Sequence, residues 1–246
     1  MTFGSLFSGI GGIDLGLERA GMTCKWQVEM DDFCQEILTK HWPDVPKHKD
    51  IKEVRNLPYV DLIAGGFPCQ DVSVAGKQAG IQKETRSGLW FEFARIIRMV
   101  RPEYILVENV SGLLNNGMGV VLGELAQIGY DAEWQSIQAC WFGAPHRRER
   151  IFIIAYSNSQ RIKGVRQEKV CRQPFFSWCE GIRRVEGFRN RSDIPFPLIR
   201  RINDGVRNRV DNLGNAVVPQ VAEYIGKAII NSNQCIQGTH DKTVRP

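Results

Sequence analysis

The 246-residue sequence has no apolar run close to the roughly 20 residues that a membrane-spanning helix needs. Its N-terminus also has no basic segment leading into an apolar stretch, so it does not have the form of a signal peptide. The seven cysteines are odd in number and no two have CxxC spacing, which argues against a disulfide scaffold and a zinc site. We therefore expect a cytoplasmic protein without a membrane partner or a bound metal.

An excess of one charge sign is confined to a single segment. The formal net charge is +5, yet residues 160–210 alone hold thirteen Lys and Arg against five Asp and Glu, a balance of +8, so the remainder carries −3. This segment is also rich in Asn, Pro and aromatic residues, without clear periodicity. Such a composition suits contact with nucleic acid, although a solvated basic loop would have the same charge.

From Thr2 to Tyr156 short apolar runs alternate with longer amphipathic ones. This alternation is typical of a mostly parallel sheet covered by helices. The apolar runs predict strands at 3–7, 23–29, 61–64, 104–108, 132–139 and 151–156. The amphipathic runs predict helices at 13–20, 33–41, 89–100 and 120–128, and Gly21 and Gly129 predict helix ends.

The regular pattern stops after Tyr156 and returns in a helix predicted at 219–230. There is no internal repeat. The simplest organisation is an α/β domain over 1–156, a small basic segment over 157–211, a helix that returns to the first domain within 212–230, and a tail over 231–246.

One cysteine stands out because of its surroundings. Cys69 lies in Gly65-Gly66-Phe67-Pro68-Cys69-Gln70, a constrained turn directly after a predicted apolar strand. Open α/β sheets do their chemistry at the carboxyl ends of strands, and a thiol with an ordinary pKa of about 8.5 must be ionised to act as a nucleophile. A lone cysteine is more often a buried apolar filler, but the Pro68 turn favours the nucleophile.

Three further motifs follow predicted strands or precede one: Phe7-Ser8-Gly9-Ile10-Gly11-Gly12, Glu108-Asn109-Val110 and Arg148-Glu149-Arg150. With the Cys69 turn and Leu213-Gly214-Asn215-Ala216-Val217-Val218-Pro219, they resemble the motifs of the C5-cytosine DNA methyltransferase family, in the same order. The resemblance covers roughly 2–156 and 212–230. It implies an α/β fold: the S-adenosylmethionine-dependent methyltransferase (Rossmann-like) sheet, with a small inserted target-recognition domain.

The resemblance implies S-adenosyl-L-methionine as cofactor. Within it, Glu29 would accept hydrogen bonds from the ribose hydroxyls, and Asp50 and Ile51 would hold the adenine. Taken singly, Glu29 could be an ordinary acid at a strand end and Asp50 a helix cap. The spacing from Gly9 to Glu29 would also suit a dinucleotide enzyme, but the glycines fall as G-x-G-G. The whole implied cofactor set is Phe7, Gly9, Gly11, Gly12, Glu29, Asp50, Ile51, Pro68, Asn215 and Val217.

The resemblance also implies the catalytic residues. Cys69 would add to C6 of cytosine, and Glu108, its pKa raised by apolar surroundings, would donate a proton to N3. Arg150 would hydrogen-bond O2 of the ring, and Arg148 would steady the site. His146 stands where the family usually has Gln. Glu108 could instead pair with a local arginine, and the arginines could be solvated or bind phosphate.

The implied function is DNA (cytosine-5)-methyltransferase activity on a cytosine flipped out of double-stranded DNA, by a monomeric protein. A cognate restriction endonuclease is a further partner that the resemblance allows. Two alternatives remain open. One is an RNA cytosine-5 methyltransferase with the same fold, and the other is a catalytically weak DNA-binding protein whose recognition segment is too short.

Overall fold

The computed structural model describes residues 1–68, 81, 86–144, 146–157 and 216–240. The predicted nucleophile Cys69, the predicted cofactor contact Asn215 and residues 158–211 of the predicted recognition segment lie outside these residues.

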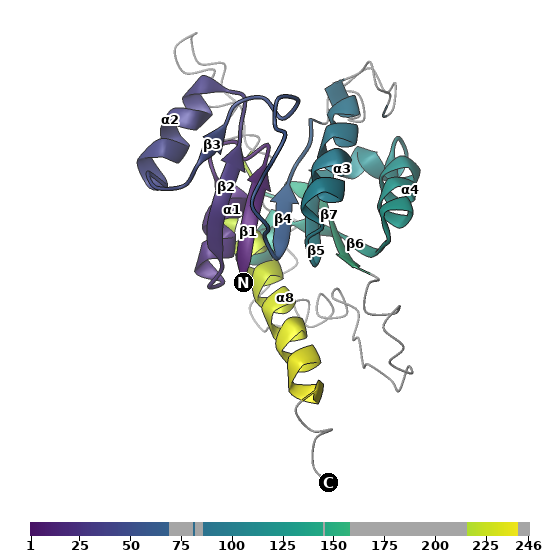
Figure 1. Ribbon diagram of the computed structural model, residues 1–246. Helices are drawn as coiled ribbons and strands as arrows, with labels where there is room; N and C mark the ends of the chain where they lie inside the picture. Colours follow the sequence, from purple (N-terminus) through teal and green to yellow (C-terminus); the bar gives the residue numbers. More distant parts are fainter. Residues whose placement is uncertain (69–80, 82–85, 145, 158–215, 241–246) are drawn as a thin grey trace.

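Seven strands form one mixed sheet in the order β3-β2-β1-β4-β5-β7-β6 (Figure 1). Strands β1 to β5 run parallel to one another, and β7 is inserted antiparallel between β5 and β6. This confirms the mostly parallel sheet, and the two-residue β3 is the strand that the sequence did not predict. The bounds are β1 Thr2–Leu6, β2 Thr23–Val28, β3 Lys47–His48, β4 Leu62–Gly65, β5 Tyr104–Val110, β6 Tyr130–Gln138 and β7 Glu149–Ser157.

The predicted helices are all present. Gly21 and Gly129 each have a φ of 96° just beyond a helix, which confirms them as helix ends. The last helix continues to His240, so the predicted tail is wrong for residues 231–240. The helices are α1 Gly12–Arg19, α2 Asp32–His41, α3 Leu89–Val100, α4 Met118–Ile128 and α8 Pro219–His240, with 3₁₀ turns η1 Arg86–Gly88, η2 Ser111–Leu114 and η3 Ala139–Phe142.

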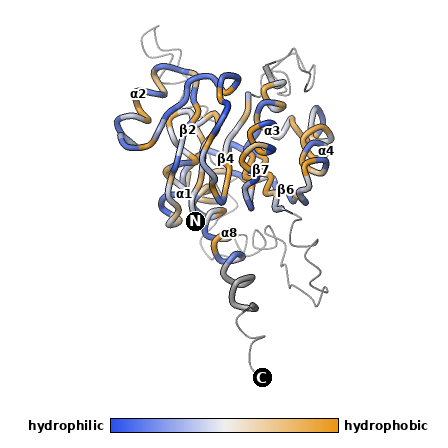
Figure 2. Tube along the Cα trace, in the orientation of Figure 1, coloured by the Kyte–Doolittle hydropathy of each residue, from blue (hydrophilic) through white to orange (hydrophobic). Residues whose placement is uncertain are grey.

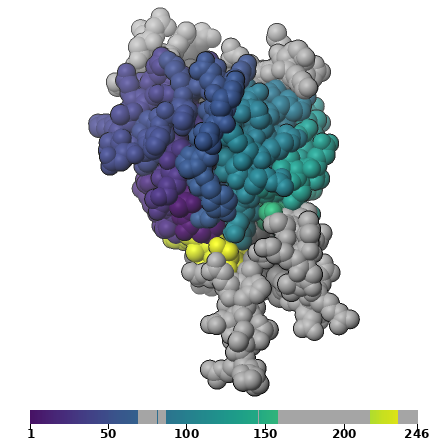
Figure 3. All heavy atoms as spheres, viewed as in Figure 1, coloured from purple at the N-terminus to yellow at the C-terminus, as the bar shows by residue number. Residues whose placement is uncertain are grey.

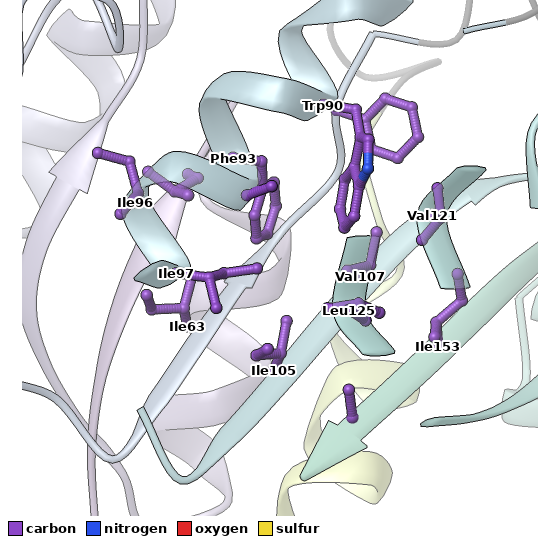
Figure 4. Close-up of a cluster of buried hydrophobic side chains, with 14 of the residues drawn as sticks. Ile63, Trp90, Phe93, Ile96, Ile97, Ile105, Val107, Val121, Leu125 and Ile153 are labelled. Atoms are coloured by element: carbon purple, nitrogen blue, oxygen red, sulfur yellow. The ribbon is translucent and has the colours of Figure 1, made fainter. Parts of the chain in front are cut away.

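Each face of the sheet has its own apolar core, because successive residues of a buried strand point to opposite faces. Ile63 of β4 belongs to the cluster formed with α3 and α4, whereas its neighbours Leu62 and Ala64 belong to the cluster formed with α1 and α8. Figure 4 shows the first core, in which Trp90 and Phe93 of α3 lie over the central strands. Both faces of the central strands are thereby buried.

The helices match this arrangement in their sequence pattern. Figure 2 shows α3 and α4 alternating between hydrophobic and hydrophilic stretches, as helices with one buried side do. In Figure 3 the N-terminal half and the α3–α4 half form one continuous surface on the side shown. Among the described residues, no helix is both long enough and apolar enough to cross a membrane.

Helix α8 packs directly on α1, as the predicted returning helix requires. The contact is close because both helices carry glycines where they meet. A β carbon on Gly16 would lie 2.4 Å from the carbonyl oxygen of Pro219, and one on Gly226 would lie 2.8 Å from the β carbon of Ala20. Larger side chains at either glycine would push the two helices apart.

Candidate active site

A cavity of about 440 Å³ opens at the carboxyl ends of the parallel strands. Each of the five parallel strands contributes the residues at or just beyond its carboxyl end, and the antiparallel β7 contributes the residues at its start. The lining residues are Phe7, Val28, Glu29, Met30, Lys49, Asp50, Ile51, Lys52, Gly66, Phe67, Pro68, Leu89, Glu108, Asn109, Val110, Arg148 and Arg150.

The loop after β1 is held in an unusual backbone conformation. Phe7 has a φ of 54° and Gly9 one of 56°, and Phe7 is a cavity-lining residue. A left-handed conformation is uncommon for a bulky residue and persists only where its surroundings enforce it. The amide of Gly9 donates to Oε2 of Glu29 at 2.7 Å, and the amide of Ser8 donates to the carbonyl of Val28 at 3.2 Å. The end of β2 therefore shapes the loop that follows β1.

A buried polar network lies beneath the same loop. Oδ2 of Asp14 accepts from the hydroxyl of Ser5 at 2.9 Å, Oδ1 accepts from the amide of Gln27 at 2.7 Å, and Ser5 in turn accepts from Ser8. Asp14 is fully buried, and desolvation raises the pKa of its carboxyl to about 6 despite the hydrogen bonds from Gln27 and Ser5, which lower it. The network joins α1, β1, β2 and the loop.

Glu29 is both a strand-end acid and a wall of the cavity. One carboxylate oxygen accepts from Gly9 and the other from the amide of Asp31 at 2.8 Å. Each oxygen of an ionised carboxylate can accept a second hydrogen bond. The two backbone amides thus fix the orientation of Glu29 and leave it able to accept from a ligand.

Asp50 begins a turn, not a helix, in which its Oδ1 accepts from the amide of Lys52 at 2.8 Å. The next residue, Ile51, is 4% exposed and anchors the turn in the apolar core. Both residues line the cavity together with Lys52.

The loop after β4, which leads to Cys69, is tied down from two directions. The side-chain amide of Asn109 donates to the carbonyl of Phe67 at 3.1 Å, and the hydroxyl of Ser87 donates to the carbonyl of Pro68 at 3.0 Å. Asn109 and Ser87 are both buried. These two bonds hold the last two peptides before Cys69, whose own position lies outside the described residues.

Glu108 lies near the end of β5 and is 8% exposed. Burial raises the pKa of its carboxyl above the ordinary value, while the charges of Arg150 and Arg148 lower it. The Nε atom of Arg150 lies 3.1 Å from Oε1, as an ion pair. The same oxygen accepts no hydrogen bond of good angle from the described residues, so it retains the capacity to share a proton with a ligand.

The antiparallel pairing of β5 with β7 brings the acid and the arginines together. Val110 lies opposite Arg150, and Glu108 lies opposite Phe152. The start of β7 is therefore beside the end of β5, although the two motifs are far apart in the sequence. Arg148 and Arg150 line the same cavity as Glu108.

The structure thus gathers eight of the predicted site residues around one cavity: Phe7, Glu29, Asp50, Ile51, Pro68, Glu108, Arg148 and Arg150. Gly9, Gly11, Gly12 and Val217 do not line it. Gly12 faces the segment before α8, since a β carbon on it would lie 2.4 Å from the carbonyl oxygen of Val217, and Gly11 faces Trp42. Their contact with a cofactor stays a prediction.

Five cavity residues outside the predicted motifs were not identified from the sequence: Val28, Met30, Lys49, Lys52 and Leu89. Val28, Met30 and the two lysines each adjoin a predicted site residue, so neighbourhood in the sequence was an available signal. Leu89 begins α3 and had no local signal, because only the packing of α3 on the sheet brings it to the cavity.

Residues 1–189 match the family model of the C-5 cytosine-specific DNA methylases. The chain belongs to this family. Three curated relatives illustrate its place there: the type II methyltransferases M2.BsuMI of Bacillus subtilis (42% identical over 159 residues), M.Eco47II of Escherichia coli (40% over 162) and M.HhaI of Haemophilus parahaemolyticus (33% over 169). These alignments cover 61%, 62% and 66% of this chain.

The chain spans about half of the length of these relatives or less: the same alignments cover 41%, 39% and 51% of the lengths of M2.BsuMI, M.Eco47II and M.HhaI. Among solved structures, a prophage-encoded protein of E. coli described as a DNA modification methyltransferase is 27% identical, with a TM-score of 0.53 and coverage of 65% of this chain and 48% of that one. Spodoptera frugiperda DNMT2, 20% identical with a TM-score of 0.54, shows the same fold over 68% of this chain and 53% of its own.

Proposed function

We propose that this chain is a DNA (cytosine-5)-methyltransferase that uses S-adenosyl-L-methionine. The observation that carries the proposal is one cavity lined by five of the predicted cofactor residues and by three of the predicted catalytic residues, Glu108, Arg148 and Arg150. Membership of the C-5 cytosine-specific DNA methylase family and the names of its type II relatives support the same activity. These relatives are named type II methyltransferases, and we propose on that basis that a companion restriction endonuclease accompanies this chain.

The cavity fits the proposed cofactor in its chemistry. Glu29 offers carboxylate oxygens to ribose hydroxyls, while Phe7, Ile51 and Leu89 offer apolar contact to an adenine ring. A volume of about 440 Å³ lies within the roughly 300–1,000 Å³ typical of small-molecule sites. When bound, S-adenosylmethionine supplies an electrophilic methyl group on its sulfonium sulfur.

The chain's own residues would make cytosine C5 able to accept that methyl. In the proposed mechanism the Cys69 thiolate forms a bond to C6, and Glu108 gives its proton to N3, which leaves electron density at C5. Arg150 donates to O2 and offsets the charge on the ring, while Arg148 helps to hold Glu108. After methylation a solvent base takes the C5 proton, the C6–sulfur bond breaks, and the N3 proton returns to the Glu108 carboxylate. The thiolate and the neutral methylated base are then released.

The target must be flipped out of the duplex, because the ring face is inaccessible in the stack. We propose that the basic segment 157–211 contacts the DNA and supplies the energy that offsets the few kcal/mol of unstacking. The catalytic domain would then comprise residues 1–156 together with the returning helix.

Two measurements test the activity. Incorporation of tritium from labelled cofactor should occur with double-stranded DNA and not with tRNA, and bisulfite sequencing of DNA from expressing cells should locate the methylated site. Transfer to tRNA alone would favour the RNA methyltransferase, and DNA binding without transfer would favour the catalytically weak protein.

A covalent adduct tests the nucleophile. DNA that carries 5-fluorocytosine should trap the parent protein, because fluorine blocks the final proton removal at C5. The Cys69→Ser variant should form no adduct, since a hydroxyl is far less ionised than a thiol. Cys140→Ser is the matched control, because Cys140 is partly exposed and does not line the cavity. Methylation by Cys69→Ala at a rate comparable to the parent would contradict the mechanism.

A further inference from the structure

The turn over residues 50–54 is attached to helix α3 by one side chain. The guanidinium of Arg95 donates through one terminal nitrogen to the carbonyl of Val54 at 2.8 Å and through the other to the carbonyl of Ile51 at 2.6 Å. Its Nε donates to Oε2 of Glu92 at 2.6 Å. All three nitrogens of the fork therefore have a partner, and two of the partners lie more than 40 residues away in the sequence.

This attachment bears on the cavity although Arg95 does not line it. Asp50, Ile51 and Lys52 of the turn line the cavity, and so does Leu89, the first residue of the helix that carries Arg95. Arg95 thus connects two walls of the cavity, one that comes from the segment after β3 and one that comes from α3.

Apolar packing alone would not fix the turn in the same way. The side chains of Ile51 and Val54 are 4% and 5% exposed, so they anchor the turn to the core. Such contact is non-directional and leaves the peptide planes free to tilt. The planar, rigid fork of a guanidinium fixes two carbonyls at once, which the single ammonium of a lysine does not do in the same geometry. Glu92 holds the fork in the required orientation.

We propose that Arg95 is a positioning residue for the adenosine end of the cofactor, acting through the turn 50–54 and oriented by Glu92. The proposal rests on the proposed function, in which Asp50 and Ile51 hold the adenine. Loss of Arg95 then weakens binding of the ground state and transition state equally, so KM for the cofactor rises while kcat at saturation is preserved.

The test compares Arg95→Met, Arg95→Lys and the control Arg98→Met. Arg98 lies on the same helix and is ion-paired with Glu124 of α4, away from the cavity. We expect Arg95→Met to raise KM for S-adenosylmethionine about 10-fold with kcat and KM for DNA within about twofold of the parent. The KM of Arg95→Lys for S-adenosylmethionine should lie between those of the parent and Arg95→Met. Arg98→Met should have the same KM and kcat as the parent.

A ligand probe locates the effect. Methylthioadenosine carries the adenosine without the amino acid portion, so its dissociation constant should rise in Arg95→Met by the same factor as that of S-adenosylmethionine. A general loosening of the fold would instead lower kcat and the fraction of active protein, with KM unchanged.

Hydrogen exchange provides a readout that needs no activity. The amides of Glu53 and Val54 donate within the turn, to Asp50 at 3.0 Å and to Ile51 at 3.3 Å. Their exchange should be about 10-fold faster in Arg95→Met and unchanged in Arg98→Met. Unchanged exchange and unchanged KM in Arg95→Met would overturn the positioning role. A parent protein that binds neither S-adenosylmethionine nor methylthioadenosine would overturn the proposed function, and this role with it.

Discussion

The carboxylate of Glu108 lies directly against Gly66: a β carbon placed on the glycine would be 2.6 Å from Oε2. Gly66 directly follows β4, and Glu108 lies in the neighbouring parallel strand β5, at the edge where the cavity opens. A glycine two residues before Pro68 therefore makes room for the acid that is proposed to protonate the base.

Gly66→Ala should displace the Glu108 carboxylate and lower kcat, toward the ~10²- to 10⁴-fold loss expected for a missing general acid. KM for the cofactor should change little. The measurement is steady-state methylation with both substrates varied. Gly123→Ala is the control: it lies inside α4 with open space around its β carbon, so it should keep full activity and gain about 0.5–1 kcal/mol of stability. Full activity in Gly66→Ala would mean that this close contact is not needed.

Glu108→Gln should lower the single-turnover rate by ~10²- to 10⁴-fold, because an amide can hydrogen-bond N3 but cannot deliver a proton. Burial raises the pKa of the parent carboxyl, so the parent should lose rate as pH rises through that pKa and the donor form disappears. The variant should lack this decline. A large loss of cofactor affinity in Glu108→Gln would assign the residue to the cofactor instead.

Asp14→Asn should change how stability depends on pH. The pKa of Asp14 rises from 3.8 in the unfolded chain to about 6 in the fold, so between these values the folded state binds more protons. Its contribution to the free energy of unfolding is therefore greatest below pH 4, falls as pH rises to about 6, and then stays constant, with a total change of about 3 kcal/mol. An asparagine does not titrate; its Oδ1 can accept from the amide of Gln27, and its Nδ2 can donate to the hydroxyl of Ser5 in a bond of reversed direction.

Urea unfolding of parent and Asp14→Asn at pH 4.5, 5.5 and 7.5 checks this expectation. The stability of the variant relative to the parent should increase from the lowest pH to the highest. A constant difference across the three pH values would mean that Asp14 does not titrate in this range.

The basic segment predicts a strong salt dependence of DNA binding. If six phosphates are neutralised, log affinity should fall with log salt with a slope of about −5. Replacing Arg183 and Arg184 by alanine should reduce that slope by about 1 to 2 if they contact phosphate, or alter the methylated site if they contact bases. Lys227→Met, which removes an exposed charge on α8, should leave the slope unchanged. An unaltered slope and site after the double change would place recognition elsewhere.

The elements were predictable where local patterns are strong. Apolar runs marked β4 and β5, which are buried on both faces, and glycines with positive φ marked the ends of α1 and α4. The two-residue β3 was missed because it is too short to show a period. The outer part of α8 was missed because residues 231–240 are mostly polar, with only Cys235 and Ile236 apolar, so no apolar period continues there. Each further residue can still add a backbone hydrogen bond.

The sequence by itself determined which chemical groups are present and in what order, because the motifs around Phe7, Pro68, Glu108 and Arg150 are local strings. Only the tertiary structure decided that they share one cavity. The antiparallel direction of β7 places Arg150 beside Glu108, and the packing of α3 places Arg95 against the turn at Ile51. Strand direction and contacts between distant residues depend on how whole elements pack against one another. The periodicity of a single segment does not show which other element that segment will pack against.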